Sequence, residues 1–286
     1  MVPPKKSVLI TGCSAGGIGA ALAFSFQKRG FLVFATTRNT AKIPTTLTSL
    51  PNVVVVQLDV TSQSSVDAAA QSVRTTLLSS SEGGGNKENE IGLDILINNS
   101  GLGSWGPILD TSIDDAKAQF DVNFFGVIRV TQAFADLLVK AKGTLINTSS
   151  LSGIMWEPYK SIYGASKAAL TQASETWRLE LEPLGVRVVT LNVGQVKSEF
   201  FSDLPTEMKL PGTSYYLPVK ERLDRMLRPD WSTRAPDTTA FAEQVVGDIL
   251  GGKTGLVWRG GYSTMAKFFH LLPTWLMVGF SPRLYI

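Results

Sequence analysis

The sequence predicts an α/β fold in which one doubly wound parallel sheet is covered by helices on both faces. Short apolar runs alternate with longer helical patterns along most of the 286 residues, and no internal repeat interrupts them. The apolar runs are continuous rather than alternating with polar residues, as in strands buried on both faces. A hydrophobic content of 44% and a charged content of 18% indicate one large globular domain.

The elements follow one another in a regular order. The first apolar run ends in a glycine-rich turn that opens a helix, the third run is almost pure valine, and a polar, glycine-rich stretch (residues 79–92) is typical of an exposed loop without chemistry. The expected strands are residues 7–11, 32–36, 53–58, 94–97, 144–147 and 186–191. The expected helices are residues 20–29, 64–78, 113–139 (one long helix or a pair) and 161–184.

The composition restricts the classes of function. The formal net charge of +3 comes without a basic block, which argues against a nucleic-acid partner. The single cysteine, Cys13, cannot form an internal disulfide and fits the reducing cytoplasm. With His270 as the single histidine, neither a metal site nor a histidine-based triad is expected. The short basic start before the first strand does not resemble a signal peptide.

One short segment carries a serine, a tyrosine and a lysine. Tyr163 and Lys167 are four residues apart in an expected helix and therefore lie on one face. A tyrosine has an ordinary pKa near ~10, and an ammonium one turn away is expected to lower that pKa toward neutrality. Ser150 follows an expected strand, where its hydroxyl can hydrogen-bond a substrate oxygen. The alternative is that the three are ordinary surface or capping residues.

The glycine-rich turn after the first expected strand has the context of a dinucleotide-binding loop. Glycines let the backbone approach a pyrophosphate, and a helix N-terminus favours its negative charge. The alternative is an ordinary tight turn. The loop residues expected to contact the cofactor are Gly12, Ser14, Gly17, Ile18 and Gly19.

The end of the second expected strand indicates which nicotinamide cofactor is bound. An acidic residue there binds the ribose 2′-hydroxyl of NAD, whereas an arginine accommodates the 2′-phosphate of NADP. Residues 34–39 contain no acidic residue and one arginine, Arg38. We therefore expect NADP(H), the alternative being that Arg38 is a solvated loop residue.

Together these motifs resemble those of the short-chain dehydrogenase/reductase family over roughly residues 7–200. The glycine loop, LDVT at 58–61, NNSG at 98–101, DVNFFG at 121–126 and the serine, tyrosine and lysine occur in family order and spacing. The resemblance implies a single Rossmann-like domain with a parallel sheet of about seven strands. It also implies hydride transfer between a nicotinamide cofactor and a carbonyl or alcohol carbon.

The resemblance assigns further residues to the cofactor. Asp59 and Val60 would contact the adenine ring, and Asn99 would lie beside the adenosine ribose. Val196 and Ser198 match positions that contact the nicotinamide carboxamide. These assignments place the cofactor along the carboxyl ends of several strands.

Four residues match the family's catalytic positions. Ser150 would hold the substrate oxygen, and Tyr163 would act as the acid in reduction and as the base in oxidation. Lys167 would bind the nicotinamide ribose and lower the tyrosine pKa, so that Tyr163 and Lys167 count as cofactor-binding as well as catalytic. Asn123 would link Lys167 to a proton relay through a backbone distortion and a water.

Three departures from the family pattern stand out. The loop has one extra residue between Gly12 and Gly17, which can shift the phosphate contacts by one residue. The usual alanine of the NNAG motif is Ser100, and the usual proline after the sixth strand is Val193. All four catalytic positions are nevertheless present.

We expect residues 1–260 to form the domain, with a lid over the substrate at residues 200–230, and residues 261–286 to form an apolar tail. The apolar stretch 268–280 contains Pro273 and is too short to span a bilayer as a helix. It suits a peripheral membrane contact, a cover for the substrate pocket or an oligomer contact. The resemblance also implies a homo-oligomer.

The leading prediction is NADPH-dependent reduction of a carbonyl on a small hydrophobic substrate. The glycine loop, ATTRN at 35–39 and LLPTWL at 271–276 are similar to the 1-acyldihydroxyacetone-phosphate reductase subgroup, which implies that substrate and an association with endoplasmic reticulum or lipid droplets. Alternatives are a hydroxysteroid-type dehydrogenase and a tailoring ketoreductase of secondary metabolism. A catalytically idle NADP-binding module and a peripheral membrane protein, defined by its tail, are the alternatives from other classes.

Overall fold

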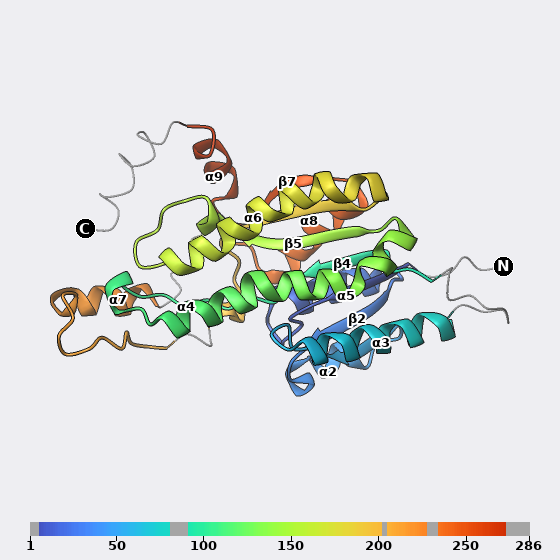
Figure 1. Cartoon of the computed structure of the whole chain (residues 1–286), viewed down its shortest axis with the longest axis horizontal. Coiled ribbons are helices and arrows are strands. Elements are labelled where there is room, and N and C mark those ends of the chain that lie inside the picture. Colours follow the sequence, from blue (N-terminus) through green and yellow to red (C-terminus); the bar gives the residue numbers. More distant parts are fainter. Residues whose placement is uncertain (1–5, 81–90, 202–204, 228–233, 273–286) are drawn as a thin grey trace.

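The computed structural model describes residues 6–80, 91–201, 205–227 and 234–272, whose strands form one parallel sheet (Figure 1). The strand order is β3-β2-β1-β4-β5-β6-β7, and every neighbouring pair is parallel. The strands are β1 (Ser7–Ile10), β2 (Leu32–Thr37), β3 (Val53–Gln57), β4 (Ile95–Asn98), β5 (Thr144–Ser150), β6 (Arg187–Val193) and β7 (Gly255–Arg259). The order reverses between β1 and β4, so the sheet is doubly wound, as predicted.

Helices cover both faces of the sheet (Figure 1). One face carries α1 (Ile18–Lys28), α2 (Thr45–Thr48) and α8 (Thr238–Leu250), and the other carries α3 (Gln63–Ser80), α5 (Gly126–Ala141) and α6 (Ser161–Leu181). Three further helices follow the carboxyl ends of strands: α4 (Ile113–Phe120), α7 (Lys220–Met226) and α9 (Ser263–Phe269). This is a Rossmann-like arrangement of two helical layers around a sheet.

The central strand β1 shows why its sequence is apolar throughout. Val8 and Ile10 pack with Phe26 on one face of the sheet, and Leu9 packs with Phe134 on the other. The valine-rich run of β3 is different, because β3 lies at the edge of the sheet and Val55 is 37% exposed. The expectation that this run is buried on both faces is therefore wrong, and its valines reflect β-propensity on a half-covered edge.

Element positions follow the prediction within a few residues, with informative differences. β5 extends three residues beyond the predicted end, to Ser150, and the predicted helix 113–139 is one continuous helix in which a π-helix, Asp121–Phe125, joins α4 to α5. The continuous helix is long and apolar enough for a membrane span, as core helices often are, and its α5 part packs against α3 and the sheet. Within the predicted loop 79–92, residues 81–90 lie outside the described residues.

A chain of buried hydrogen bonds ties the carboxyl end of β4 and the middle of β5 to the helices that cover them. Asn98 Nδ2, at the end of β4, donates to Asn147 Oδ1 on β5 (2.9 Å) and to Thr131 Oγ1 on α5 (3.0 Å). Asn147 Nδ2 in turn donates to Ser174 Oγ on α6 (2.8 Å). Because buried amides are costly without partners, this network holds β4, β5, α5 and α6 in one register.

The predicted lid and tail are described in part. Residues 202–204 and 228–230 of the lid, and 273–286 of the tail, lie outside the described residues. Within the tail, α9 packs through Ala266 against Leu151 and Trp258, whereas Phe268 is 63% exposed and Leu271 is 76% exposed. The domain boundary at residue 260 and the role of the tail stay predictions.

A glycine-to-alanine substitution at Gly194 tests the packing at the carboxyl edge, and a second one at Gly247, away from that edge, is its control. A Cβ at Gly194 would lie 2.0 Å from the carbonyl oxygen of Gly261, so Gly194→Ala must push two backbones apart and should lower the free energy of unfolding by about 2 kcal/mol or more. In Gly247→Ala, inside α8, the new Cβ meets no described atom within 4 Å and should stabilise by about 0.5–1 kcal/mol. Urea unfolding followed by circular dichroism measures both; equal effects would contradict this packing.

Candidate active site

The predicted site residues gather at the carboxyl edge of the sheet, beside the switch point. Gly12 follows β1, Asn99 follows β4, Ser150 ends β5 and Val196 follows β6. Because the carboxyl ends of parallel strands meet at one edge, these four segments border a common space.

The turn between β1 and α1 is tightly closed around its glycines. Gly12 has a φ of +75°, and a Cβ at Gly19 would lie 2.4 Å from the carbonyl oxygen of Gly12. Asn99 Nδ2 donates to the carbonyl oxygen of Thr11 (2.9 Å), and the Thr11 hydroxyl accepts from the backbone N–H groups of Asn99 and Ser100, both at 2.9 Å. The NNSG motif after β4 therefore holds the glycine loop in shape, and Ser100 is accommodated.

The N-terminus of α1 fits a phosphate group. Its N-cap is Gly17, which has no side chain to cap the first N–H groups, and the first turn from Ile18 has no acidic residue, so these N–H groups remain suited to an anion. Gly16, inside this lengthened loop, has a φ of +69°, which glycine adopts without strain. Ser14 and Ile18 are half-buried beside this turn. The backbone therefore fits the pyrophosphate of a dinucleotide.

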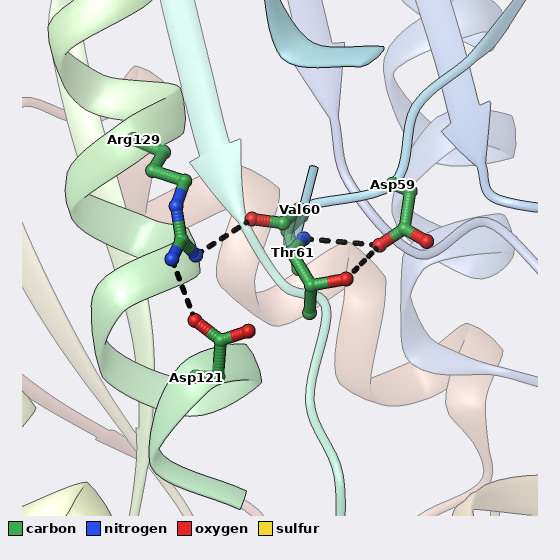
Figure 2. Close-up of polar contacts among 5 residues, drawn as sticks. All are labelled: Asp59, Val60, Thr61, Asp121 and Arg129. Carbon is green, nitrogen blue, oxygen red and sulfur yellow. Dashed lines mark hydrogen bonds and ion pairs between the residues drawn. The ribbon is translucent and has the colours of Figure 1, made fainter. Parts of the chain in front are cut away.

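The residues assigned to the adenine end lie after β2 and β3. Arg38 is exposed, and its carbonyl oxygen accepts from Gln57 Nε2 (3.1 Å). Asp59 Oδ1 accepts from the backbone N–H of Thr61 (3.0 Å) and from its hydroxyl (2.7 Å), as Figure 2 shows. These bonds, the backbone one first, lower the pKa of Asp59, and attraction by Arg38 contributes less. Val60 is buried beside them.

The three residues of the predicted catalytic segment come together. Tyr163 and Lys167 are both buried and lie one turn apart on α6, and Tyr163 shares a hydrogen bond with the Ser150 side chain at the end of β5. Lys167 Nζ donates to the carbonyl oxygen of Thr148 (2.8 Å). The ring of Phe200, from the segment after β6, lies 6.2 Å from the Tyr163 ring. The catalytic roles of these residues stay predictions.

Burial sets the acidities of this pair. It raises the pKa of Tyr163 to about 12, against the opposing effect of the Ser150 hydrogen bond, and the negative charge of Glu157 raises it further. Burial also lowers the pKa of Lys167 to about 8. The expectation that Lys167 lowers the tyrosine pKa toward neutrality is not met here, because desolvation outweighs the other influences on the phenol.

Asn123 lies in the backbone distortion that the resemblance implied. It is fully buried inside the π-helix, where Asn123 Oδ1 accepts from the N–H of Leu102 (2.8 Å) and Nδ2 donates to the carbonyl oxygen of the same residue (2.9 Å). Nδ2 also donates to Ser166 Oγ (3.0 Å), which in turn donates to the carbonyl oxygen of Tyr163. Asn123 therefore contacts α6 between Tyr163 and Lys167.

The segment after β6 reaches across to the glycine loop. Val196 is buried, Ser198 is half-buried, and the backbone N–H of Glu199 donates to the carbonyl oxygen of Gly16 (3.1 Å). Lys197 N–H donates to the carbonyl oxygen of Pro236 (2.9 Å). The two residues assigned to the nicotinamide carboxamide are thus on the same side of the sheet as the phosphate loop.

Sequence reasoning missed a polar cluster beside Tyr163. Glu157 accepts hydrogen bonds from the Ser152 hydroxyl and from Lys160 Nζ, the latter at 2.8 Å, and the Lys160 ammonium lies 4.5 Å from the centre of the Trp105 ring. Tyr159, with a φ of +67°, joins this cluster to the lid through an edge-on contact with Tyr216. These residues lie in loops, where no periodicity marks their direction.

Comparison with known proteins agrees with this geometry. Residues 6–209 match the short chain dehydrogenase family, and the chain belongs to this family of oxidoreductases. A Talaromyces islandicus protein named short-chain dehydrogenase cctT is 40% identical over 268 residues, which cover 93% of this chain and 89% of that protein. A Schizosaccharomyces pombe protein named NADPH-dependent 1-acyldihydroxyacetone phosphate reductase is 39% identical over 281 residues, covering 94% and 90%.

A solved structure shares the fold over the whole chain. The short chain dehydrogenase of Burkholderia cenocepacia J2315, solved in complex with NADP, matches with a TM-score of 0.73 and covers 99% of this chain and 100% of its own. Its sequence identity is 24%, so the likeness supports the Rossmann-like fold alone.

Replacing Lys167 tests the cost of burying its ammonium. Below pH 8 the lysine is protonated in both the folded and the unfolded chain; between its folded pKa of about 8 and its ordinary 10.5 the folded chain releases the proton first, so the cost fades as pH rises. Lys167→Met should therefore raise the free energy of unfolding at pH 7 by up to about 3 kcal/mol, and the gain should vanish above pH 10.5.

Urea unfolding at several pH values measures this gain, with Lys117→Met, at an exposed lysine, as the control. A Lys167→Met protein that is less stable than the wild type at pH 7 would contradict the interpretation.

Proposed function

We propose that this chain reduces a ketone or aldehyde carbonyl on a hydrophobic substrate with NADPH. The observation that carries the proposal is the buried grouping of Ser150, Tyr163 and Lys167 at the carboxyl edge, beside a turn that fits a pyrophosphate. When bound, NADPH supplies the hydride that the carbonyl carbon accepts. Every other part of the reaction falls to the chain's own residues.

The acidities support the direction of reduction. Ser150 and Tyr163 hydrogen-bond the carbonyl oxygen, and Tyr163 donates its phenolic proton to that oxygen as negative charge develops on it. With a pKa raised to about 12, the phenol is protonated at neutral pH and is still a stronger acid than an alcohol. Lys167, held at Thr148, orients the cofactor ribose and contributes positive charge below its pKa of about 8.

Arg38 supports NADP(H) over NAD(H). It is the charged residue directly after β2, and the side chain is exposed and close enough to Asp59 to affect its pKa. A guanidinium in this position matches the 2′-phosphate of NADP. The relative named as an NADPH-dependent reductase, which aligns over 94% of this chain, agrees with the same choice.

The substrate we propose is 1-acyldihydroxyacetone phosphate or another amphiphilic ketone. The named activity of the Schizosaccharomyces pombe relative supports the first. The exposed apolar side chains of Tyr215, Phe268 and Leu271, from segments that follow β6 and β7, support a hydrophobic substrate. The same residues support a peripheral contact with the surface of the endoplasmic reticulum or a lipid droplet, which we propose as the site of action.

The first experiment follows NADPH oxidation by the absorbance of the reduced nicotinamide, with 1-acyldihydroxyacetone phosphate in mixed micelles. Tyr163→Phe should lower kcat by roughly 10²- to 10⁴-fold, because it removes the proton donor, and should weaken the binding of NADPH far less. Tyr262→Phe, at a tyrosine that packs beside Trp258 and has no part in the proposal, is the control. Full turnover by Tyr163→Phe would refute the mechanism. If the wild type reduces a different ketone but not 1-acyldihydroxyacetone phosphate, the substrate assignment is wrong and the mechanism stands.

Replacing Arg38 tests the cofactor choice. Arg38→Asp should raise the KM for NADPH by roughly 10- to 100-fold, because a carboxylate repels the 2′-phosphate. The same change should raise kcat/KM for NADH. Arg38→Lys keeps the charge and should retain the preference for NADPH. Steady-state kinetics with both cofactors measure the ratio, and an unchanged ratio in Arg38→Asp would show that Arg38 does not read the phosphate.

A further inference from the structure

Arg129 on α5 connects two segments that sequence reasoning treated separately (Figure 2). Arg129 Nη2 contacts Asp121 Oδ1 at 2.7 Å, and Nη1 donates to the carbonyl oxygen of Val60 at 3.3 Å. The planar guanidinium fork can hold two such acceptors at a fixed distance from each other, which an ammonium cannot do. One side chain therefore bridges the segment after β3 and the beginning of the π-helix.

The contact on the Val60 side is part of an ordered turn. The carboxylate of Asp59 accepts both hydrogen bonds of Thr61, and the backbone N–H of Asp59 donates to Ser65 Oγ (3.0 Å). Val60 itself is 7% exposed and packs against Gly126 so closely that a Cβ there would lie 2.9 Å from Val60 Cγ2. A displacement of this turn must therefore change the contacts that Val60 makes with Gly126 and with Arg129.

The contact on the Asp121 side reaches the catalytic asparagine. Asp121 begins the π-helix, and its carbonyl oxygen accepts the N–H of Gly126 five residues later. Asn123 lies inside that turn with both its amide atoms committed to Leu102 and Ser166. A π-helix is a locally marginal backbone state, so its geometry depends on contacts at its ends.

We propose that Arg129 is a positioning residue that couples occupation of the adenine end of the cofactor site to the placement of Asn123. The inference rests on the proposed function, because Asp59 and Val60 must be the adenine contacts. Binding at the Val60 turn tightens the Arg129 bridge and the Gly126 contact, and both hold the π-helix that presents Asn123 to α6. Arg129 touches neither cofactor nor substrate in this scheme.

The partial exposure of the Arg129–Asp121 ion pair indicates that the pair positions the π-helix rather than stabilising the fold. The side chains of Arg129 and Asp121 are 28% and 36% exposed, in the range where an ion pair contributes little to the free energy of unfolding. Arg74 and Asp136 form a comparable pair, with a 2.7 Å contact and exposures of 30% and 45%, between α3 and the same helix α5. That pair contacts neither Val60 nor the π-helix, which makes it a matched control.

Hydrogen–deuterium exchange with adenine fragments tests the coupling without requiring turnover. Adenosine 2′,5′-bisphosphate and 5′-AMP resemble the adenine halves of NADP and NAD and lack the nicotinamide. In the wild type, a saturating fragment should slow amide exchange in residues 121–126 several-fold. Arg129→Gln should lose that protection at a concentration that still saturates the Val60 turn, whereas Arg74→Gln should keep it.

Further variants make each outcome decisive. Arg129→Lys, which keeps the charge without the fork, should lose most of the protection while circular dichroism shows a folded chain. Protection of residues 121–126 that is unchanged in Arg129→Gln, or absent in the wild type with the fragment bound, overturns the coupling and leaves the proposed function standing. If neither fragment binds the wild type, the adenine assignment fails, and the proposed function with it.

Discussion

The burial of the Lys167 ammonium is the constraint on which the rest of the site depends. Removing a charge from water costs free energy unless protein groups replace the lost hydration. Lys167 is 4% exposed, so its ammonium depends on hydrogen-bond partners within the protein. Lys167 Nζ donates to the carbonyl oxygen of Thr148, which requires β5 to continue past its predicted end and place that carbonyl below α6. The hydroxyl of Ser149 bonds the Lys167 carbonyl oxygen and Thr171, which anchors α6 over the strand.

The same burial separates the acidities of the two central groups. It raises the pKa of Tyr163 to about 12 and lowers that of Lys167 to about 8, so the phenol holds its proton while the ammonium is close to losing one. The charge of Glu157, fixed by Ser152 and Lys160, reinforces the first effect. Under the proposed function, a tyrosine that stays protonated can donate its proton to the alkoxide that develops as the carbonyl is reduced.

Buried polar side chains connect β4 and β5 to the helices that cover them. Asn98 and Asn147 pair across β4 and β5, and Asn123 pairs with the backbone at Leu102 and with Ser166 on α6. Each amide is satisfied by partners from a different element, so no one element can shift alone. The continuous helix from α4 to α5 carries both Asn123, which bonds Ser166 on α6, and Arg129, which bonds the segment after β3 at Val60.

The sequence by itself determined the features that depend on neighbouring residues, namely the positions of strands, turns and helix faces. Continuous apolar runs located six strands, glycines located the turn after β1, and the spacing of Tyr163 and Lys167 placed them on one face of α6, because periodicity and backbone freedom are properties of neighbouring residues. Tertiary structure alone decided the edge position of β3, the place of β7, the acidity of Tyr163 and the partners of Glu157 and Arg129. Burial and charge at a residue are set by segments distant in the chain, which no local pattern contains.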